Sequence, residues 1–195
     1  MIEWLNVSSL VVSTILFTFF YIKSVGPATL EQKIGERAWE VCARYRLAMG
    51  VFEFLTIVNY VLYYFYPLPL PLPNQLPWDW WLSLVFAVLI GVPSVYLMVR
   101  GMMDAGEETL KPRKEHEMYG GIYERMRHPQ AVGESVVWFP FALLLHSTFL
   151  VLYSFIFIPI MYIFCIYEER DLLIRFGKSY EEYRQAIGFF GRKKP

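Results

Sequence analysis

The feature that most constrains this chain is a series of five long apolar runs. They cover approximately residues 4–22, 47–66, 80–99, 133–145 and 149–167. An α-helix needs about 20 apolar residues to cross the hydrocarbon core of a bilayer. Hydrophobic residues make up 56% of the 195 residues and aromatic residues 18%, which is above soluble usage. The runs predict an all-α integral membrane protein with five transmembrane helices and a single domain, residues 1–195.

The segments between the runs support this division. Residues 67–77 are rich in proline, which lacks an amide donor and restricts the residue before it, so this connector cannot be helical. Trp78, Trp80 and Trp81 follow at once and predict an aromatic belt at the membrane interface. Residues 146–148 supply the turn between the last two runs, the first of which is short for a full crossing.

Basic residues predict the orientation, because Lys and Arg gather in cytoplasmic loops. The proline-rich connector and the last turn contain no Lys or Arg, whereas the alternate segments are basic. These basic residues are Lys23, Lys33, Arg37, Arg44 and Arg46, then Arg100, Lys111, Arg113, Lys114, Arg125 and Arg127, then Arg170, Arg175, Lys178, Arg184, Arg192, Lys193 and Lys194. We therefore expect the N-terminus outside and the C-terminus in the cytoplasm.

Charge and metal-binding residue types narrow the classes of partner. The net charge of zero gives no sign of nucleic-acid binding. Cys42 and Cys165 lack a CxxC spacing, and the three histidines do not form an i, i+4 pair. We therefore expect no disulfide framework, no bound metal and no nucleic acid. Membrane lipids are the expected surroundings, and the sequence leaves the oligomeric state open.

Two polar clusters flank the hairpin formed by the last two apolar runs. The first is GGIYERMRHPQAVG, residues 120–133, and the second is EERDLLIRFGKSYEEYRQ, residues 168–185. Polar residues at the edge of hydrocarbon are costly unless they are paired or bind something. Because one hairpin joins the clusters, we expect them to meet on one membrane face. Apolar spacing in 168–187 predicts a cytoplasmic amphipathic helix, or two helices divided at Gly177.

The first cluster suits a nucleotide-like cofactor with a polar tail. Proline at 129 disfavours a helical backbone at His128, which places the imidazole at a helix boundary. Tyr119 and Tyr123 can stack on a purine. The neighbouring glycines allow a ligand to approach the backbone. The alternative is a plain turn at Gly120 and Gly121 with two tyrosines as interface anchors.

The remaining ionisable residues each have two interpretations. Glu168 and Glu169 either cap the start of the tail helix or accept hydrogen bonds from a cofactor ammonium or ribose. Arg127 and Arg170 either face lipid headgroups or orient an anionic substrate group. Glu53, inside the second run, is either functional or makes a packing hydrogen bond within the bundle.

At these residues the chain resembles the isoprenylcysteine carboxyl methyltransferase family and its membrane methyltransferase relatives, and it looks like a prokaryotic-type member. The pattern is a histidine, G-x-Y, R-H-P, a double glutamate after one hairpin, and F-G-x-x-Y-x-x-Y. It covers about residues 110–187. The matching positions are His116, Gly121-Ile122-Tyr123, Arg127-His128-Pro129, Glu168-Glu169, and Phe176-Gly177 with Tyr180 and Tyr183.

The resemblance implies S-adenosylmethionine as the cofactor and a lipophilic acceptor that arrives from the bilayer. It places the cofactor pocket in the C-terminal half, residues 101–195, and leaves residues 1–100 as an anchor and substrate region. The implied cofactor-binding residues are His116, Glu117, Met118, Tyr119, Gly121, Tyr123, His128, Pro129, Gln130, Ala131 and Glu168. His128 and Glu168 are the candidate catalytic residues, and Arg127, Phe164 and Arg170 the candidate substrate-binding residues.

The acceptor is the open question. The family's prenylcysteine enzymes are expected to carry an arginine for the substrate carboxylate at the position of Phe164, and often a tyrosine at the position of Ala131. A carboxylate acceptor has a pKa near 4 and needs no general base. A lipid amine must lose a proton, for which His128 or Glu168 would be candidates. We expect a carboxylate acceptor first and a lipid amine second.

Two other functions fit parts of the pattern. Membrane sterol and steroid reductases have a similar C-terminal pattern and use NADPH, whose extra phosphate would favour more basic residues around the pocket. A non-catalytic transporter or scaffold would favour broken helices in repeated halves, which this sequence does not show. Binding of either cofactor separates these alternatives.

Overall fold

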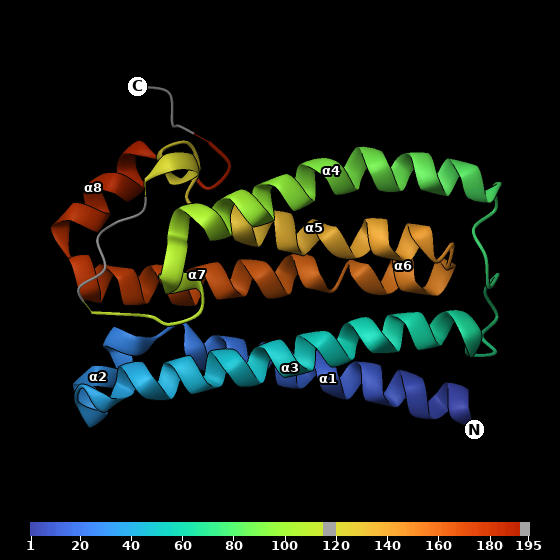
Figure 1. Cartoon of the computed structure of the whole chain (residues 1–195), viewed down its shortest axis with the longest axis horizontal. Helices are drawn as coiled ribbons and strands as arrows, with labels where there is room; N and C mark the ends of the chain where they lie inside the picture. Colours follow the sequence, from blue (N-terminus) through green and yellow to red (C-terminus); the bar gives the residue numbers. More distant parts are fainter. Residues whose placement is uncertain (115–119, 192–195) are drawn as a thin grey trace.

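The computed structural model describes residues 1–114 and 120–191. Within these ranges the chain is an all-helical bundle without strands, as predicted (Figure 1). The α-helices are α1 (Ile2–Ser24), α2 (Pro27–Ile34), α3 (Arg37–Phe65), α4 (Trp80–Ala105), α5 (Pro129–Leu144), α6 (Thr148–Ser154), α7 (Phe157–Phe176) and α8 (Lys178–Ala186), with 3-10 turns η1 (Gly106–Thr109) and η2 (Gly121–Glu124).

Four helical stretches of the described chain are long and apolar enough to cross a membrane: Ile2–Ser24, Arg37–Phe65, Trp80–Thr109 and Thr148–Phe176. The remaining predicted span, 133–145, lies in α5, whose 16 residues extend about 24 Å at 1.5 Å per residue. Figure 1 shows α5 antiparallel to α4, with the start of α1 and helix α8 at opposite ends of the bundle. That arrangement is consistent with an odd number of crossings, but a fifth span and the orientation remain predictions.

The observed helix ends differ from the predicted ones for local reasons. Helix α4 continues past Val99 to Ala105, and an ion pair of 3.0 Å between Arg100 and Asp104, four residues apart, supports the added turn. Pro159, which has no amide hydrogen, lies in the first turn of α7, just after the break between α6 and α7. Gly177, with φ +56°, ends α7 before α8 begins. The predicted division of the tail helix at Gly177 is confirmed.

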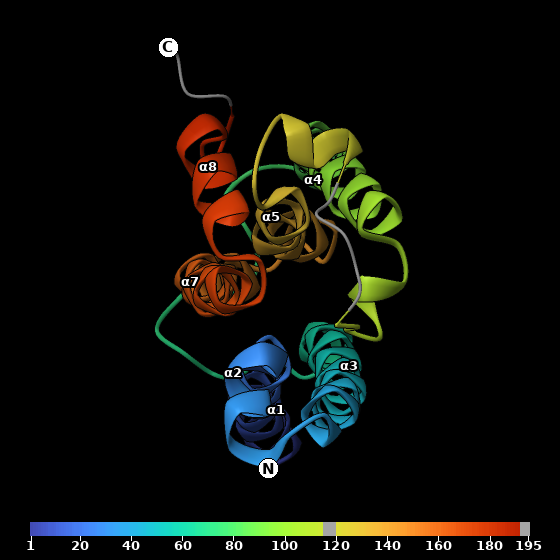
Figure 2. The ribbon, with the colours of Figure 1, turned by 90° about the vertical axis from the view of Figure 1, so that its left-hand side faces the viewer.

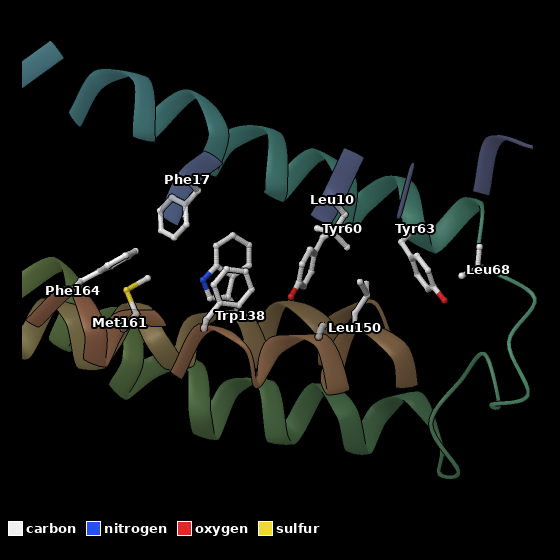
Figure 3. Packing of buried hydrophobic residues seen from close by; sticks show 11 residues of the cluster. Leu10, Phe17, Tyr60, Tyr63, Leu68, Trp138, Leu150, Met161 and Phe164 are labelled. Atoms are coloured by element: carbon white, nitrogen blue, oxygen red, sulfur yellow. The ribbon is translucent and has the colours of Figure 1, made fainter. Parts of the chain in front are cut away.

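Aromatic rings join the two parts of the bundle. Figure 3 shows the buried side chains of the α1–α3 pair facing those of α5, α6 and α7. Trp138 stacks on Phe157 with 4.2 Å between ring centroids and lies 5.2 Å from Tyr60. Tyr21 stacks on Phe164 at 3.9 Å. Side-chain packing holds helices together inside a bilayer, where lipid tails are as apolar as the helices, so these rings fix the α1–α3 pair against the rest.

The proline-rich connector is bound to the turn between α5 and α6. His146 adopts φ +52°, and its Nδ1 lies 2.7 Å from the hydroxyl of Ser83 on α4. The indole of Trp78 donates to the same hydroxyl at 3.0 Å, and Gln75 pairs with Ser147 in an isolated bridge. The predicted turn at residues 146–148 is therefore confirmed, and it holds this end of the α5–α7 hairpin in place.

Two glycines allow α4 and α5 to pack closely. A Cβ atom at Gly133 would lie 2.4 Å from the carbonyl oxygen of Ser94 and 2.5 Å from the amide nitrogen of Met98. A Cβ at Gly101 would lie 2.8 Å from the amide nitrogen of Gln130. Small residues at such crossings let backbones approach each other. This crossing positions the first turn of α5.

Substitution Gly133→Ala should destabilise the protein by about 1–3 kcal/mol, because the added methyl group meets backbone atoms that cannot move aside. The matched control is Gly50→Ala on α3, where nothing lies within 4 Å of the added Cβ. There the better helix propensity of alanine should preserve or raise stability. Thermal unfolding of both variants in detergent checks this, and an equal response would show that the crossing is not tight.

Candidate active site

The two polar clusters meet at one end of the bundle, which we call the site end. It contains α2, η1, η2, α8, the start of α5 and the end of α7, and Figure 2 views the molecule from this end. The Nε2 atom of His128 lies 2.8 Å from Oε1 of Glu169, and its Nδ1 lies 3.4 Å from Oε2 of Glu168. The prediction that the hairpin brings the clusters together is confirmed.

The two glutamates do not cap the tail helix. Glu168 and Glu169 lie inside α7, which continues to Phe176, and Gly177 occupies the N-cap position of α8. The capping interpretation was therefore wrong, because α7 extends past the end of its apolar run. As neighbours on α7 the two carboxylates reach different sides of the same imidazole.

His128 is buried at the start of α5 between two carboxylates. It has φ −130° and ψ 56°, immediately before Pro129 in the first helical position, where proline's missing amide hydrogen costs nothing. The residue is 4% exposed. Burial alone would lower the pKa of the imidazole, but interactions with Cys165, Glu168 and Glu169 outweigh burial and hold the pKa well above its usual value.

Arg127 completes this charged group, and we call His128, Glu168, Glu169 and Arg127 the site cluster. One guanidinium nitrogen of Arg127 lies 3.2 Å from Glu169, and another donates to the carbonyl of Arg184 on α8 at 3.3 Å. Its side chain is only 12% exposed. Arg127, just before α5, therefore connects to α7 through Glu169 and to α8 through the carbonyl of Arg184. The sequence did not indicate these connections.

The G-x-Y segment is fixed by Asp104 at the end of α4. Gly121 has φ +64°, and a Cβ there would lie 2.3 Å from a carboxylate oxygen of Asp104. The same oxygen accepts a hydrogen bond of 2.7 Å from the amide of Ile122. The hydroxyl of Tyr123 donates to the carbonyl of Gly101, and Tyr183 of α8 donates to the carbonyl of Tyr123 at 2.7 Å. Burial raises the pKa of Tyr183 to about 12, so its phenol remains a donor.

A small recess of about 40 Å³ lies against the site cluster. Its walls include most of the predicted pocket residues that the structure describes, together with four residues that the predicted site lacked. The predicted residues are Tyr123, Arg127, His128, Gln130, Ala131 and Glu168, and the additional ones are Tyr21, Leu172, Tyr180 and Tyr183. Tyr180 and Tyr183 belong to the F-G-x-x-Y-x-x-Y pattern, which could have indicated them. Tyr21 lies far away in sequence and gave no such signal.

The other predicted residues have different positions. Gly121 and Pro129 shape the backbone and are not among the residues that line the recess. Phe164 is buried in the aromatic core behind Tyr21, and the guanidinium of Arg170 lies 5.6 Å from the ring of Tyr167 on an exposed part of α7. Neither lines the recess or the cavities that continue from it. Residues 116–119, predicted to bind the cofactor, lie outside the described residues.

The recess continues into a cavity of about 920 Å³. The two share Tyr21, Tyr123, Gln130, Glu168 and Leu172. This volume falls in the range of small-molecule sites, roughly 300–1,000 Å³. Many residues of the anchor region also line it, Arg46 and Glu53 of α3 among them, so the cavity is not built from the C-terminal half alone.

The walls of the cavity change in character along its length. At the site end the buried ion pair between Glu108 and Arg175 measures 2.6 Å, and Arg46 donates to the carbonyl of Glu108. On the other side the cavity shares Glu53 and Met98 with a groove of about 1,050 Å³ between α3, α4 and α5. The groove is lined almost entirely by apolar side chains. A polar ligand from water and an apolar ligand from the bilayer can therefore reach one space.

Among residues 1–114 and 120–191, no group of three or more His, Cys, Asp and Glu side chains is arranged to hold a metal ion. The ionisable residues of the site cluster instead neutralise one another through short contacts.

Comparison with known proteins gives one match. The family model described as phospholipid methyltransferase matches residues 81–179, about half of the chain. The matched segment runs from the start of α4 through α7 and contains the first polar cluster and residues 168–179 of the second. No curated protein and no solved structure matches the chain.

The site cluster predicts a pH-dependent stability. Because the pKa of His128 is raised on folding, the imidazolium stabilises the folded state fully below about pH 6.5, the usual histidine value. That stability is lost as the pH rises through the higher folded-state pKa. Glu169→Gln should destabilise the protein by about 3 kcal/mol and reduce this decline, because the closer carboxylate partner is gone.

The Tm measured from pH 6 to pH 10 checks this expectation. Glu182→Gln is the control, since Glu182 pairs with Lys178 on the exposed face of α8 and should leave the wild-type pH profile unchanged. Parallel profiles for wild type and Glu169→Gln would contradict a stabilising charge on His128.

Proposed function

The chain belongs to the phospholipid methyltransferase family, and we propose that it uses S-adenosylmethionine to methylate a lipophilic acceptor that enters from the bilayer. This is the same membrane methyltransferase family as the isoprenylcysteine carboxyl methyltransferases, so the resemblance seen in the sequence is confirmed. The family and the four apolar helices make the chain an integral membrane methyltransferase.

One observation carries the proposal: the recess beside the site cluster opens into a cavity that reaches an apolar groove. A methyl donor is charged and water-soluble, whereas a lipid acceptor arrives through hydrocarbon. Methyl transfer is an in-line displacement, so the main tasks are to align the two reactants and to exclude water. A space with one polar and one apolar approach suits both tasks.

Within the site we assign Glu168 to the methyl donor. Its side chain lines both the recess and the cavity, is 34% exposed, and has one oxygen toward His128. The remaining acceptor capacity suits the ammonium or a ribose hydroxyl of S-adenosylmethionine. His128 holds Glu168 and Glu169 in place as a buried cation, so we propose that it positions the site and is not a general base.

Three cations at the site end are already engaged, which favours methyl transfer over reduction by NADPH. The extra phosphate of that nucleotide needs guanidinium or ammonium groups able to turn toward it. Arg175 pairs with Glu108, Arg127 pairs with Glu169, and Arg46 donates to backbone carbonyls. These cations are engaged in holding the site end together. Basic residues flanking the helices at this end support a cytoplasmic location for it.

Glu168→Gln should weaken the binding of S-adenosylhomocysteine by about 1–3 kcal/mol, which is the usual effect of losing a charge-assisted hydrogen bond. Isothermal calorimetry on protein in detergent measures this, with Glu182→Gln as the control of equal chemistry on the outer face of α8. NADPH is titrated in parallel.

Two results would contradict the proposal. Binding of NADPH without S-adenosylhomocysteine would move the protein to the membrane reductases. Binding of neither would leave a non-catalytic membrane protein. Unchanged affinity in Glu168→Gln would remove Glu168 from the donor site while leaving the methyltransferase assignment in place.

A further inference from the structure

The described chain ends in a tight turn after α8, residues 187–191, which we call the C-terminal turn. Ile187 is buried. The amide of Gly188 donates to the carbonyl of Gly191 at 2.7 Å, and the carbonyl of Gly188 accepts a hydrogen bond of 3.2 Å from the amide of Arg127. Backbone hydrogen bonds therefore hold the C-terminal turn against the segment just before α5.

Phe189 joins the C-terminal turn to the site cluster. Its ring centroid lies 4.9 Å from that of the His128 imidazole and 5.7 Å from that of Tyr162 on α7. Rings at such separations attract one another beyond the burial of their surface. Phe189 therefore lies against the imidazole that connects α5 to α7, and it helps to keep that imidazole in place.

Phe190 has the opposite environment. It is 76% exposed, although its ring lies only 4.8 Å from that of Phe189. Tyr162, on the other side of Phe189, is 55% exposed and belongs to the apolar stretch Thr148–Phe176. In a membrane-spanning helix a side chain this exposed faces lipid. The ring of Phe190 therefore continues the lipid-facing surface of α7 past the site cluster.

The position and charge of this segment suit the membrane interface. Figures 1 and 2 show the C-terminal turn at the site end, on the side of the bundle away from α1 and α3. Arg192, Lys193 and Lys194 follow it in the sequence. Aromatic rings and basic side chains are the residue types that anchor proteins at the membrane interface, and anionic headgroups attract basic segments.

Helix α8 itself lacks the surface needed to lie on a membrane. Its outer face is polar, with Lys178 paired to Glu182 and Arg184 paired to Glu181 at 2.8 Å. Tyr180 is turned inward and buried. A helix that rests on a bilayer needs an exposed apolar face, so α8 stays in water.

The size of the exposed surface separates a lipid from a protein partner. A specific protein interface buries about 800 Å² on each partner, far more than one phenylalanine ring offers. A headgroup layer, in contrast, takes up single aromatic rings flanked by basic residues. The C-terminal turn therefore fits an anionic membrane surface better than it fits a protein or a second copy of this chain.

We infer that the C-terminal turn docks on the anionic headgroup layer of the membrane, with Phe190 inserted, and thereby holds Phe189 against His128. The inference rests on the proposed function and adds regulation to it, because His128 in turn positions Glu168 for the methyl donor. Docking and donor binding then favour the same arrangement, so each strengthens the other.

The first test measures the depth of Phe190 in the membrane. Phe190→Cys is labelled with a nitroxide in vesicles of phosphatidylcholine and phosphatidylglycerol, where Cys42 and Cys165 are buried and stay unlabelled. Collisions with oxygen should exceed those with a water-soluble nickel complex. The matched control is a label at Glu182→Cys on the outer face of α8, which should remain in water.

Two results of this measurement would overturn docking. One is a label at position 190 that is as accessible to the nickel complex as the label at position 182. The other is spectral broadening that disappears when unlabelled protein is added, because it would show that Phe190 meets a second copy of the chain.

The second test measures the coupling to the site. S-adenosylhomocysteine should bind wild type about fivefold more tightly in vesicles with phosphatidylglycerol than in phosphatidylcholine alone. Replacing Lys193 and Lys194 by glutamine should abolish this difference. Phe189→Ala should weaken binding by about two- to tenfold, and Phe189→Leu, which keeps the apolar bulk, should restore most of it. Glu182→Gln should behave as wild type.

The outcomes distinguish the inference from the function on which it rests. Equal affinity in the two kinds of vesicle, or unchanged affinity in Phe189→Ala, would overturn the coupling. Recovery in Phe189→Leu shows that the alanine variant loses a contact and not its fold. If S-adenosylhomocysteine binds wild type in neither kind of vesicle, the proposed function fails, while the depth of the label at position 190 still decides whether the C-terminal turn docks.

Discussion

The imidazole of His128, held between Glu168 and Glu169, is the contact on which the site end depends. It joins the first turn of α5 to the last turns of α7 across the entire hairpin, at distances of 3.4 and 2.8 Å. Burying these charges is costly, and removing one partner leaves the others uncompensated. His128, Glu168 and Glu169 therefore stabilise the site end only when all three are present. With Arg127 added, it also holds the last turn of α8 against the bundle.

The rest of the cavity follows from that fixed point. Once α5 and α7 are joined at the site end, Gln130 and Glu134 face the same space as Glu168, while the apolar groove leads in from the opposite direction. Under the proposed function, the cavity separates the two reactants by the solvent from which each comes. Charged residues gathered at one end suit a water-soluble donor, and the apolar groove suits a lipophilic acceptor.

The sequence predicted the parts of the fold that follow from local pattern. Apolar length located the helices, the proline tract located the connector, and Gly177 located the division between α7 and α8. The meeting of the two clusters followed from a single hairpin. Contacts between distant segments were not predictable in this way. Asp104 lies against Gly121, Tyr21 lines the recess, and Glu53 and Glu134 line one cavity. These placements depend on how helices cross, which a single sequence does not encode in any periodicity.

The roles of the candidate site residues were harder to predict than their positions, because a role also depends on contacts with distant segments. His128 was a candidate base from its residue type, but its two carboxylate neighbours raise its pKa, and we propose instead that it holds the site in place. Phe164 was a substrate candidate from an aligned position, yet it packs on Tyr21 in the aromatic core. Environment, more than identity, decides what such residues do.

A crystal structure of the protein grown with S-adenosylhomocysteine in a lipid phase tests the central claim most directly. We predict density for the ligand in the recess and the adjoining cavity, in contact with Tyr123, Gln130 and Glu168. Ligand density elsewhere, with these residues untouched, would contradict the assignment of the site.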